Sequence, residues 1–318
     1  MMALNHTRIR IVALIVLLTP WWENSHSQAP ASPTFDKEVS KQDAIYQTRG
    51  EKVPEGYVVN RSLLSYASFL PSEFDRSLAN LGPRDRWLDI GAGQAQAILD
   101  YYTRRYDLMH FEGRERRGKK AQAVAMSIED RRTPRWYETA ASLEANQIQY
   151  WHGRRLREYS LEEAGQFQLI TDVLGGFSYT RDLSLFMEKV LSFLEVNGKF
   201  YTNLLDVLPE KGKDRASYPD TLFLTEITNP DGSDVRVCSW LKSIACVEVT
   251  CESNAEWERP MEIYRIHKVC NNVAVPSLVS LNYTAGTPPI RQFQLGGPSP
   301  ASPGRTGTSD SEPRVGPR

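Results

Sequence analysis

The sequence lacks an excess of charge of either sign, and it lacks internal repeats. Its 318 residues contain 38 Lys and Arg against 39 Asp and Glu. This balance gives the whole molecule no field that would draw it to nucleic acid or an anionic membrane. Solenoid and propeller folds are excluded because no repeat is present. With 41% hydrophobic residues, a fully disordered or fibrous chain is excluded as well, so one globular domain with tails is expected.

Long apolar runs are also missing. The N-terminal run, residues 11–18, has eight residues, far fewer than the roughly 20 that a membrane-spanning helix needs, and no later stretch could span a bilayer. Two arginines precede it, and Ser25-His26-Ser27 supplies small residues at a cleavage site. This order predicts a signal peptide over residues 1–27 and an exported protein, periplasmic or secreted. The alternatives are an uncleaved interfacial anchor and a cytoplasmic protein that begins near Phe35.

Cysteine is scarce. The four cysteines all lie in the last third of the chain, at Cys238, Cys246, Cys251 and Cys270. They lack the paired CxxC spacing of a structural zinc site, and no metal is expected. In an exported protein they can pair in three ways, one of which is a Cys238 to Cys246 bridge across a hairpin. Four buried thiols in a reducing compartment are the alternative.

The two ends of the chain differ from its middle. Residues 296–318 are rich in Gly, Pro, Ser and Thr and have no apolar periodicity, which predicts a disordered tail. Residues 28–56, rich in Gln, Ser, Lys and Pro, indicate a flexible arm. The folded domain is therefore expected over residues 57–295.

Within this domain, apolar strand patterns alternate with helical patterns. Expected strands are 86–90, 121–128, 148–151, 167–173 and 199–205, and expected helices are 94–106, 134–146 and 182–194, the last closed by Asn197-Gly198. Short connections between strands and helices predict an α/β fold with a doubly wound, mainly parallel sheet. Residues 222–269 have strand patterns without long helices, which indicates an antiparallel edge.

The end of the first expected strand carries the clearest site pattern. Gly91 and Gly93 let the backbone pass close to a ligand at the start of a helix. Gln96 stands where a dinucleotide motif has its third glycine. Asp89 would repel a pyrophosphate, but it would attract an ammonium group by about 4 kcal/mol at an effective dielectric of 20. A cofactor with a cationic amino-acid end is favoured over NAD; a turn without a ligand is the alternative.

These segments resemble a known family. Residues 88–93 (LDIGAG) are similar to the first motif of class I S-adenosylmethionine-dependent methyltransferases, and residues 167–173 (FQLITDV) and 194–200 (LEVNGKF) resemble that family's fourth and fifth strands. The resemblance covers roughly residues 85–205. It implies a Rossmann-like fold and S-adenosylmethionine as cofactor, with its methionine end lined by Asp89, Gly91, Ala92 and Gly93.

The sequence departs from the family pattern in three places, one of which is His152-Gly153-Arg154-Arg155 after the third strand, where the family often has an acid near the adenine. Ala95 stands where the family usually has another glycine, a change that tightens the turn. The family also has an acid after the second strand that holds the ribose hydroxyls. Glu129 is the candidate for that role and Asp130 is second, although Ser127 lies nearer the usual position. A solvated loop acid is the alternative for Glu129, and no adenine partner is assigned.

Methyl transfer of this kind needs little side-chain chemistry. Holding the reactants in line can contribute about 7 to 11 kcal/mol, and a base is needed only for a protonated acceptor. Asp172 ends the fourth expected strand, where the acceptor should lie. It is the candidate catalytic residue, which positions the acceptor or takes its proton; the alternative is a carboxylate that caps the next turn.

The acceptor, a small molecule or a protein, is not identified by the sequence. Two clusters follow expected strand ends, Arg131, Arg132 and Arg135, then Arg154, Arg155 and Arg157. They indicate either an anionic acceptor or solvated arginines paired with nearby glutamates. Residues 114–120 have a net charge of +4 but no interleaved aromatics, which is a weak nucleic-acid signal.

The function expected is that of a methyltransferase; the alternative is an exported binding protein that reuses the fold without catalysis.

Overall fold

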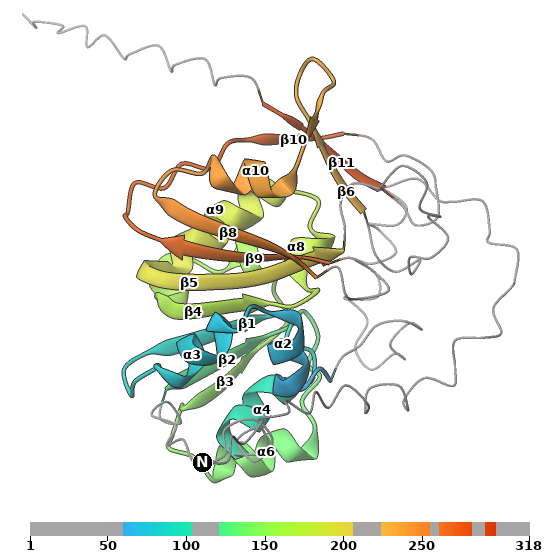
Figure 1. The fold of residues 1–318 in the computed structure, drawn as a ribbon. Helices are drawn as coiled ribbons and strands as arrows, with labels where there is room; N and C mark the ends of the chain where they lie inside the picture. The colour runs from blue at the N-terminus through green and yellow to red at the C-terminus, as the bar shows by residue number, and fades with distance from the viewer. Residues whose placement is uncertain (1–59, 104–120, 206–223, 255–260, 282–289, 297–318) are drawn as a thin grey trace, which may run out of the picture. The chain divides into compact units, whose positions relative to one another are not determined.

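A computed structural model describes residues 60–103, 121–205, 224–254, 261–281 and 290–296 (Figure 1). All of these belong to one compact unit, residues 33–318. The expected signal peptide, the arm over 28–56, the basic segment 114–120 and all but the first residue of the tail lie outside the described residues. None of the helices in the described segments is long and apolar enough to cross a membrane.

The centre of the fold is a seven-stranded sheet with the order β3-β2-β1-β4-β5-β9-β8 (Figure 1). The first five strands in sequence are parallel, and β9 and β8 run antiparallel at one edge. Their bounds are β1 Arg86–Ile90, β2 Gln122–Met126, β3 Ile148–Trp151, β4 Phe167–Asp172, β5 Leu194–Leu205, β8 Val247–Asn254 and β9 Met261–Lys268. The predicted doubly wound, mainly parallel sheet with an antiparallel edge is confirmed.

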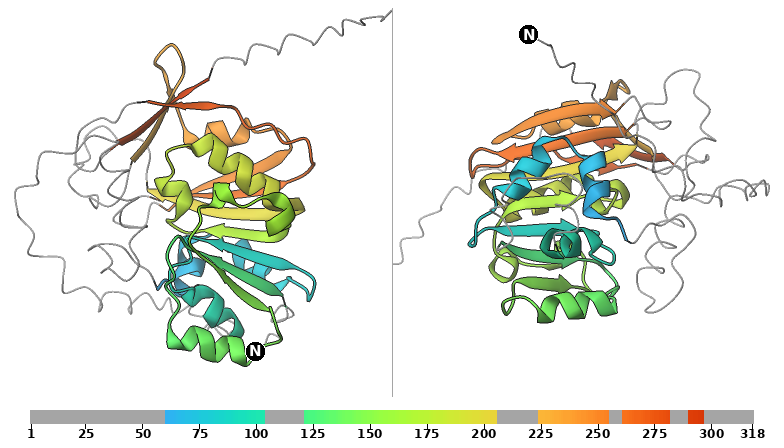
Figure 2. Two further views of the ribbon diagram at one scale, coloured as in Figure 1. Left: turned by 180° about the vertical axis from the view of Figure 1, so that it is seen from behind. Right: turned by 60° about the horizontal axis from the view of Figure 1, so that its bottom comes forward.

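Helices cover both faces of this sheet (Figure 2). On one face lie α2 Leu63–Phe69, α3 Glu73–Ala79, α4 Gln96–Thr103 and α6 Pro134–Ala141, and on the other η2 Leu156–Glu158, α7 Leu161–Ala164, α8 Gly176–Tyr179, α9 Leu183–Phe193 and α10 Val237–Lys242. Side chains alternate along each strand. Trp87 therefore packs in the core under α2 and α4, while Leu88 packs in the core under α8 and α9.

Two expected boundaries are wrong: the helix expected over 134–146 ends at Ala141, and the start of the fifth strand is displaced. Asn197-Gly198 was expected to close the helix before the fifth strand, but α9 ends at Phe193 and β5 begins at Leu194. Asn197 has a positive φ of 69°, and the pairing of β4 with β5 shifts register between Phe167 and Leu169. The Asn-Gly pair is an irregularity inside a long strand, because the same residues that form turns also form bulges.

A second, four-stranded sheet has the order β10-β11-β6-β7. Its strands are β6 Leu224–Thr228, β7 Asp234–Val235, β10 Leu278–Ser280 and β11 Ile290–Leu295. The expected antiparallel edge is therefore correct for β8 and β9, whereas β6 and β7 belong to this separate sheet. β11 pairs in parallel with β6, so the end of the domain returns beside a strand more than 60 residues earlier.

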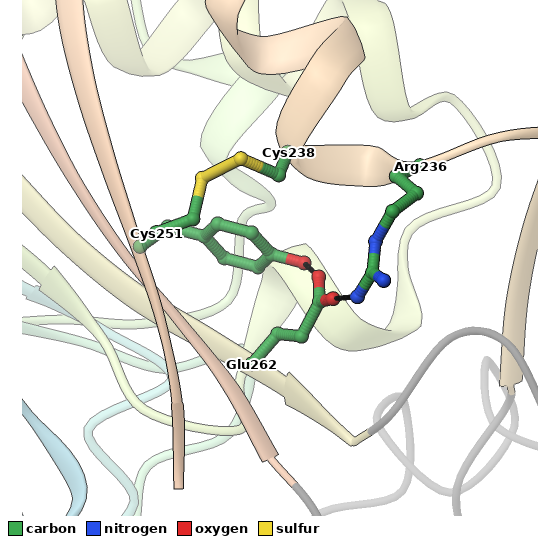
Figure 3. Close-up of a disulfide and its surroundings, with 5 residues drawn as sticks. Arg236, Cys238, Cys251 and Glu262 are labelled. Atoms are coloured by element: carbon green, nitrogen blue, oxygen red, sulfur yellow. Dashed lines mark hydrogen bonds and ion pairs between the residues drawn. A yellow bond between two sulfur atoms is a disulfide. The ribbon is translucent and has the colours of Figure 1, made fainter. Parts of the chain in front are cut away.

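The four cysteines form two disulfides. Cys238 in α10 is bonded to Cys251 in β8, and Cys246 is bonded to Cys270. The bridge from Cys238 to Cys246 and the four free thiols are therefore both wrong for this structure. Figure 3 shows the first disulfide beside Glu262, whose carboxylate accepts hydrogen bonds from Arg236 and from Tyr264. Both bridges stabilise the antiparallel edge of the main sheet.

Candidate functional site

The winding of the main sheet reverses between β1 and β4, and ligands of such sheets bind beyond the carboxyl ends of these strands. The chain after β1 turns sharply there, with positive φ angles at Gly91 (71°), Gly93 (55°) and Ala95 (58°). Glycine adopts this conformation without a steric cost, which Ala95 has to meet. The amide of Ala92 donates to the carbonyl of Met126, so the turn is also tied to the end of β2.

Gly91 lies so close to the loop after β4 that there is little room for a side chain between them. A Cβ atom on Gly91 would lie 3.0 Å from the Cα of Gly175. A Cβ atom on Gly175 would in turn lie 2.9 Å from the carbonyl oxygen of Ile90 and from Oδ1 of Asp172. The two loops at the reversal therefore pack backbone against backbone, and any side chain at either glycine would push them apart.

Asp89 lies at the end of β1, as predicted, but its side chain is not accessible from the surface. Its side chain is fully buried. Oδ1 accepts a hydrogen bond of 2.7 Å from the hydroxyl of Thr171, and the hydroxyl of Tyr66 lies 2.9 and 3.0 Å from Oδ1 and Oδ2. Burial raises the pKa of Asp89 to about 7, although the hydrogen bonds from Thr171 and Tyr66 oppose that rise. Both oxygens of Asp89 are therefore bonded to hydroxyls of the protein itself in this structure.

Tyr66 is a site residue that sequence reasoning missed. It lies in α2, in a segment where no element was expected. Its burial and the charge of Asp89 raise the pKa of Tyr66 well above the usual value, so its hydroxyl stays protonated and acts as a donor. A capping serine, Ser62, precedes α2 and accepts from the amide of Ser65; this Ser at the start of an apolar run was the available signal for the helix.

Asp172 has the geometry of a helix cap. It is fully buried at the end of β4. Oδ1 accepts from the amide of Gly175 (2.9 Å) and Oδ2 accepts from the amide of Phe177 (3.0 Å), at the start of α8. Burial raises the pKa of Asp172 to about 7; the charge of Asp89 adds to this rise and the backbone amides oppose it. Both oxygens are thus engaged in holding the loop, as in the capping alternative.

Glu129 lies after β2 in a buried position, with 6% of its surface exposed, so it is not a solvated loop acid. Its Oε2 is 2.5 Å from Nη2 of Arg131. The second candidate, Asp130, accepts two hydrogen bonds from Arg132, which lower the pKa of Asp130 to about 2. These two arginines from the first cluster therefore neutralise the two candidate acids beside them.

Tyr150 on β3 joins this loop to the glycine turn. Its hydroxyl donates to the carbonyl oxygen of Gly93 and lies 3.3 Å from the carbonyl oxygen of Glu129. The ring of Trp136 in α6 packs on it edge to face. Sequence reasoning missed Tyr150, because a tyrosine in a four-residue strand carries no local sign that its hydroxyl contacts two loops.

Other arginines of the two clusters are also paired with acids. Arg135 lies 3.3 Å from Asp100, and Arg154 lies 2.6 Å from Glu163. Pairing with acids was the alternative to an anionic acceptor, although Arg131, with 14% of its side chain exposed, is not solvated. Among the residues that the structure describes, no group of three His, Cys, Asp or Glu side chains could hold a metal ion.

Comparison with known proteins adds a fold likeness. No family model matches the sequence, and no curated protein matches it. Several solved structures are similar in fold. The chain resembles class I S-adenosylmethionine-dependent methyltransferases.

Three of these structures illustrate how distant the likeness is. The [4+2]-cyclase SpnF is 12% identical, with a TM-score of 0.45 over 76% of this chain and 98% of that one. Phosphoethanolamine N-methyltransferase 2 of Haemonchus contortus, in complex with S-adenosyl-L-methionine, is 11% identical, with a TM-score of 0.39 over 69% and 62%. A geranyl diphosphate methyltransferase is 14% identical, with a TM-score of 0.33. This match spans about half of each chain, 47% of this one and 48% of that one. A likeness this distant concerns the fold alone.

Proposed function

We propose that this protein binds S-adenosylmethionine at the carboxyl ends of β1 and β4 and transfers its methyl group to an unidentified acceptor. The observation that carries the proposal is the left-handed turn from Gly91 to Ala95 at the point where the winding reverses. Two acids, Asp89 and Asp172, lie at the same strand ends. Negative charge there fits a cofactor that carries an ammonium and a sulfonium, and it disfavours a pyrophosphate.

The residues fit this cofactor in different ways. When bound, S-adenosylmethionine would supply a methyl group on a positively charged sulfur, which is itself the leaving group. The turn at Gly91, Ala92 and Gly93 would accept the methionine end close to the backbone. Glu129, fixed by Arg131, would take the ribose hydroxyls.

Asp172 would act as a positioning residue rather than as a base. Both of its oxygens already accept backbone amides, and its carboxylate is buried. It therefore holds the loop that follows β4, on which the acceptor would rest. Catalysis by positioning alone is sufficient for an acceptor that is deprotonated at working pH.

Calorimetric titration of the purified protein with S-adenosylhomocysteine tests this proposal. Asp89→Ala should weaken binding by about 1.5 to 3 kcal/mol, roughly ten- to a hundredfold or more in affinity, because a charge-assisted contact is lost. Asp231→Asn is the matched control, since Asp231 is an exposed acid in the turn between β6 and β7 of the second sheet, bonded to Ser233. Circular dichroism confirms that each variant is folded. A folded wild-type protein that does not bind at millimolar ligand would exclude the cofactor assignment.

The alternative function is that of an exported binding protein without catalysis, which differs from the proposal in that no methyl group is transferred. It predicts S-adenosylhomocysteine binding without methyl transfer, or no binding at all. The two disulfides favour an oxidising compartment, and we propose export with cleavage after Ser27. Intact-mass analysis of protein from its native host tests this; a chain that keeps residues 1–27 and four free thiols would contradict it.

A further inference from the structure

The single-turn helix α8, residues Gly176–Tyr179, is held at both ends by buried charges. Asp172 accepts its first amides, as described above. At the other end, Nη1 of Arg291 donates to the carbonyl oxygens of Phe177 (3.0 Å) and Thr180 (2.7 Å). The ends of a helix leave amides and carbonyls without intrahelical partners, so a carboxylate and a guanidinium satisfy opposite needs.

Arg291 reaches α8 from a distant part of the chain. It lies in β11 of the second sheet, 114 residues beyond Phe177, and its side chain is fully buried. Its Nε and Nη2 donate to the hydroxyl of Thr225 in β6 at 3.2 and 2.6 Å. One guanidinium therefore joins β11, β6 and α8. Its planar group of N–H donors can bond in several fixed directions at once, which the single ammonium group of a lysine cannot do.

A buried cation is costly unless nearby groups compensate it. Burial lowers the pKa of Arg291 to about 9, while the charge of Asp172 opposes this change, so Arg291 is protonated at neutral pH. The hydrogen bonds of Arg291 to Thr225, Phe177 and Thr180 all go to neutral oxygens, and Asp172 is the acid whose charge acts on Arg291. The two charges compensate each other across one turn of helix.

The position of α8 sets the position of the glycine turn. The Cα of Gly175, directly before α8, lies 3.0 Å from where a Cβ of Gly91 would be. The two backbones are therefore too close for a side chain between them, and we infer that a displacement of α8 would move the turn after β1 as well. The second sheet therefore acts on the candidate cofactor edge through Arg291.

We propose that Arg291 is a positioning residue that fixes α8, and through α8 the turn at Gly91, in the geometry that binds the cofactor. The consequence for binding rests on the function proposed above, while the fixing of α8 does not. The alternative is that Arg291 only attaches the second sheet to α8 and has no effect on the cofactor site. The two readings differ in whether loss of the guanidinium loosens α8 in a protein that stays folded.

Hydrogen–deuterium exchange of the free protein tests the fixing of α8. Arg291→Gln should raise the exchange rate of residues 173–180 roughly tenfold or more relative to β1 and β4. In the wild type, local opening of α8 has to break the hydrogen bonds from Arg291, and in the variant these bonds are missing. Arg291→Lys should have an intermediate effect, since it keeps the charge but loses the fork. Gln292→Ala is the matched control; Gln292 is the next residue in β11 and bonds to Glu226 within the second sheet. Thr225→Val, which removes an acceptor of Arg291, should resemble Arg291→Gln more weakly.

Titration with S-adenosylhomocysteine between pH 6 and 8.5 tests the effect on the site. Asp172 is faced by Asp89 and Tyr66 from β1 and α2 and by Arg291 from β11. Loss of the guanidinium raises the pKa of Asp172 further, so affinity in Arg291→Gln should fall roughly tenfold at pH 7 and recover in part at pH 8.5. Arg291→Lys, which keeps the charge, should keep the wild-type pH profile, whereas a purely structural role of Arg291 predicts an unchanged pH profile in both variants.

The outcomes separate the two proposals. Unchanged exchange over residues 173–180 in folded Arg291→Gln overturns the fixing of α8, whatever the ligand does. Faster exchange with wild-type affinity and pH profile overturns the role in binding. Faster exchange in a wild-type background that does not bind the ligand leaves Arg291 as the residue that fixes α8 and refutes the cofactor assignment instead.

Discussion

The buried carboxylate of Asp89 should destabilise the folded protein at neutral pH. In the unfolded chain its pKa is near 3.8, and in the folded protein it is raised to about 7. Between these two values the unfolded state loses its proton first, so the free energy of unfolding falls as the pH rises from about 4 to 7. Above pH 7 the full cost, about 4 kcal/mol, is present.

Asp89→Asn removes this cost because an amide carries no charge. The amide oxygen still accepts from Thr171, and the hydroxyl of Tyr66 can turn to accept from the amide nitrogen. The variant should therefore be more stable than the wild type by up to about 4 kcal/mol at pH 8, and by less than about 1 kcal/mol at pH 4. It should lose affinity for S-adenosylhomocysteine at the same time, because the buried charge that destabilises the fold is also the charge that would bind the ammonium group.

Urea unfolding at pH 4, 6 and 8 with both disulfides intact measures the effect. Asp130→Asn is the control of opposite sign. Arg132 lowers the pKa of Asp130 to about 2, so its charge stabilises the fold above pH 4 and the control should be slightly less stable than the wild type at pH 8. If Asp89→Asn is destabilised equally at pH 4 and pH 8, the burial argument is wrong.

Three further predictions concern the same structure. Gly91→Val should lose at least about 2 kcal/mol of stability, because φ is 71° and the new Cβ meets Gly175; a melting temperature equal to that of the wild type contradicts the close packing of the loops. Replacing Cys238 and Cys251 together by serine should cost about 2 to 4 kcal/mol, and the intact wild-type mass should lie about 4 Da below that of the reduced protein because two disulfides remove four hydrogens. Tyr66→Phe should raise the pKa of Asp89, since the hydrogen bond from Tyr66 lowers it, so the pH at which S-adenosylhomocysteine binding is half lost should rise; an unchanged pH profile refutes a role for Tyr66.

The sequence predicted those parts of the fold whose signals are local. The strand expected over 86–90 is β1, and the helix expected over 182–194 is α9 within one residue at each end. Both depend on side-chain periodicity within a short window. The fold class followed from the alternation of such elements, and Asp89 with its glycines followed from their place at a strand end.

The rest of the site depends on partners that are far apart in the chain. Tyr66 lies 23 residues before Asp89, and Arg291 lies 114 residues after Phe177. No local pattern distinguishes a tyrosine or an arginine that will be buried against such a partner from one that will be exposed. The second sheet was missed for the same reason, since β11 pairs with β6 across a separation that a window of ten residues does not cover.

The disulfides and the candidate cofactor edge occupy different parts of the main sheet. Cys251 lies in β8 at the antiparallel edge, while the winding reverses between β1 and β4, with β5 and β9 in between. Oxidised cysteines are therefore compatible with an intact glycine turn. S-adenosylmethionine is made in the cytoplasm, so export would separate the protein from its source of cofactor. This separation concerns the supply of the cofactor and leaves the architecture that would bind it unchanged. Equal affinity for S-adenosylhomocysteine before and after reduction of both disulfides would support this separation, whereas loss of binding on reduction would show that the antiparallel edge helps to hold the site.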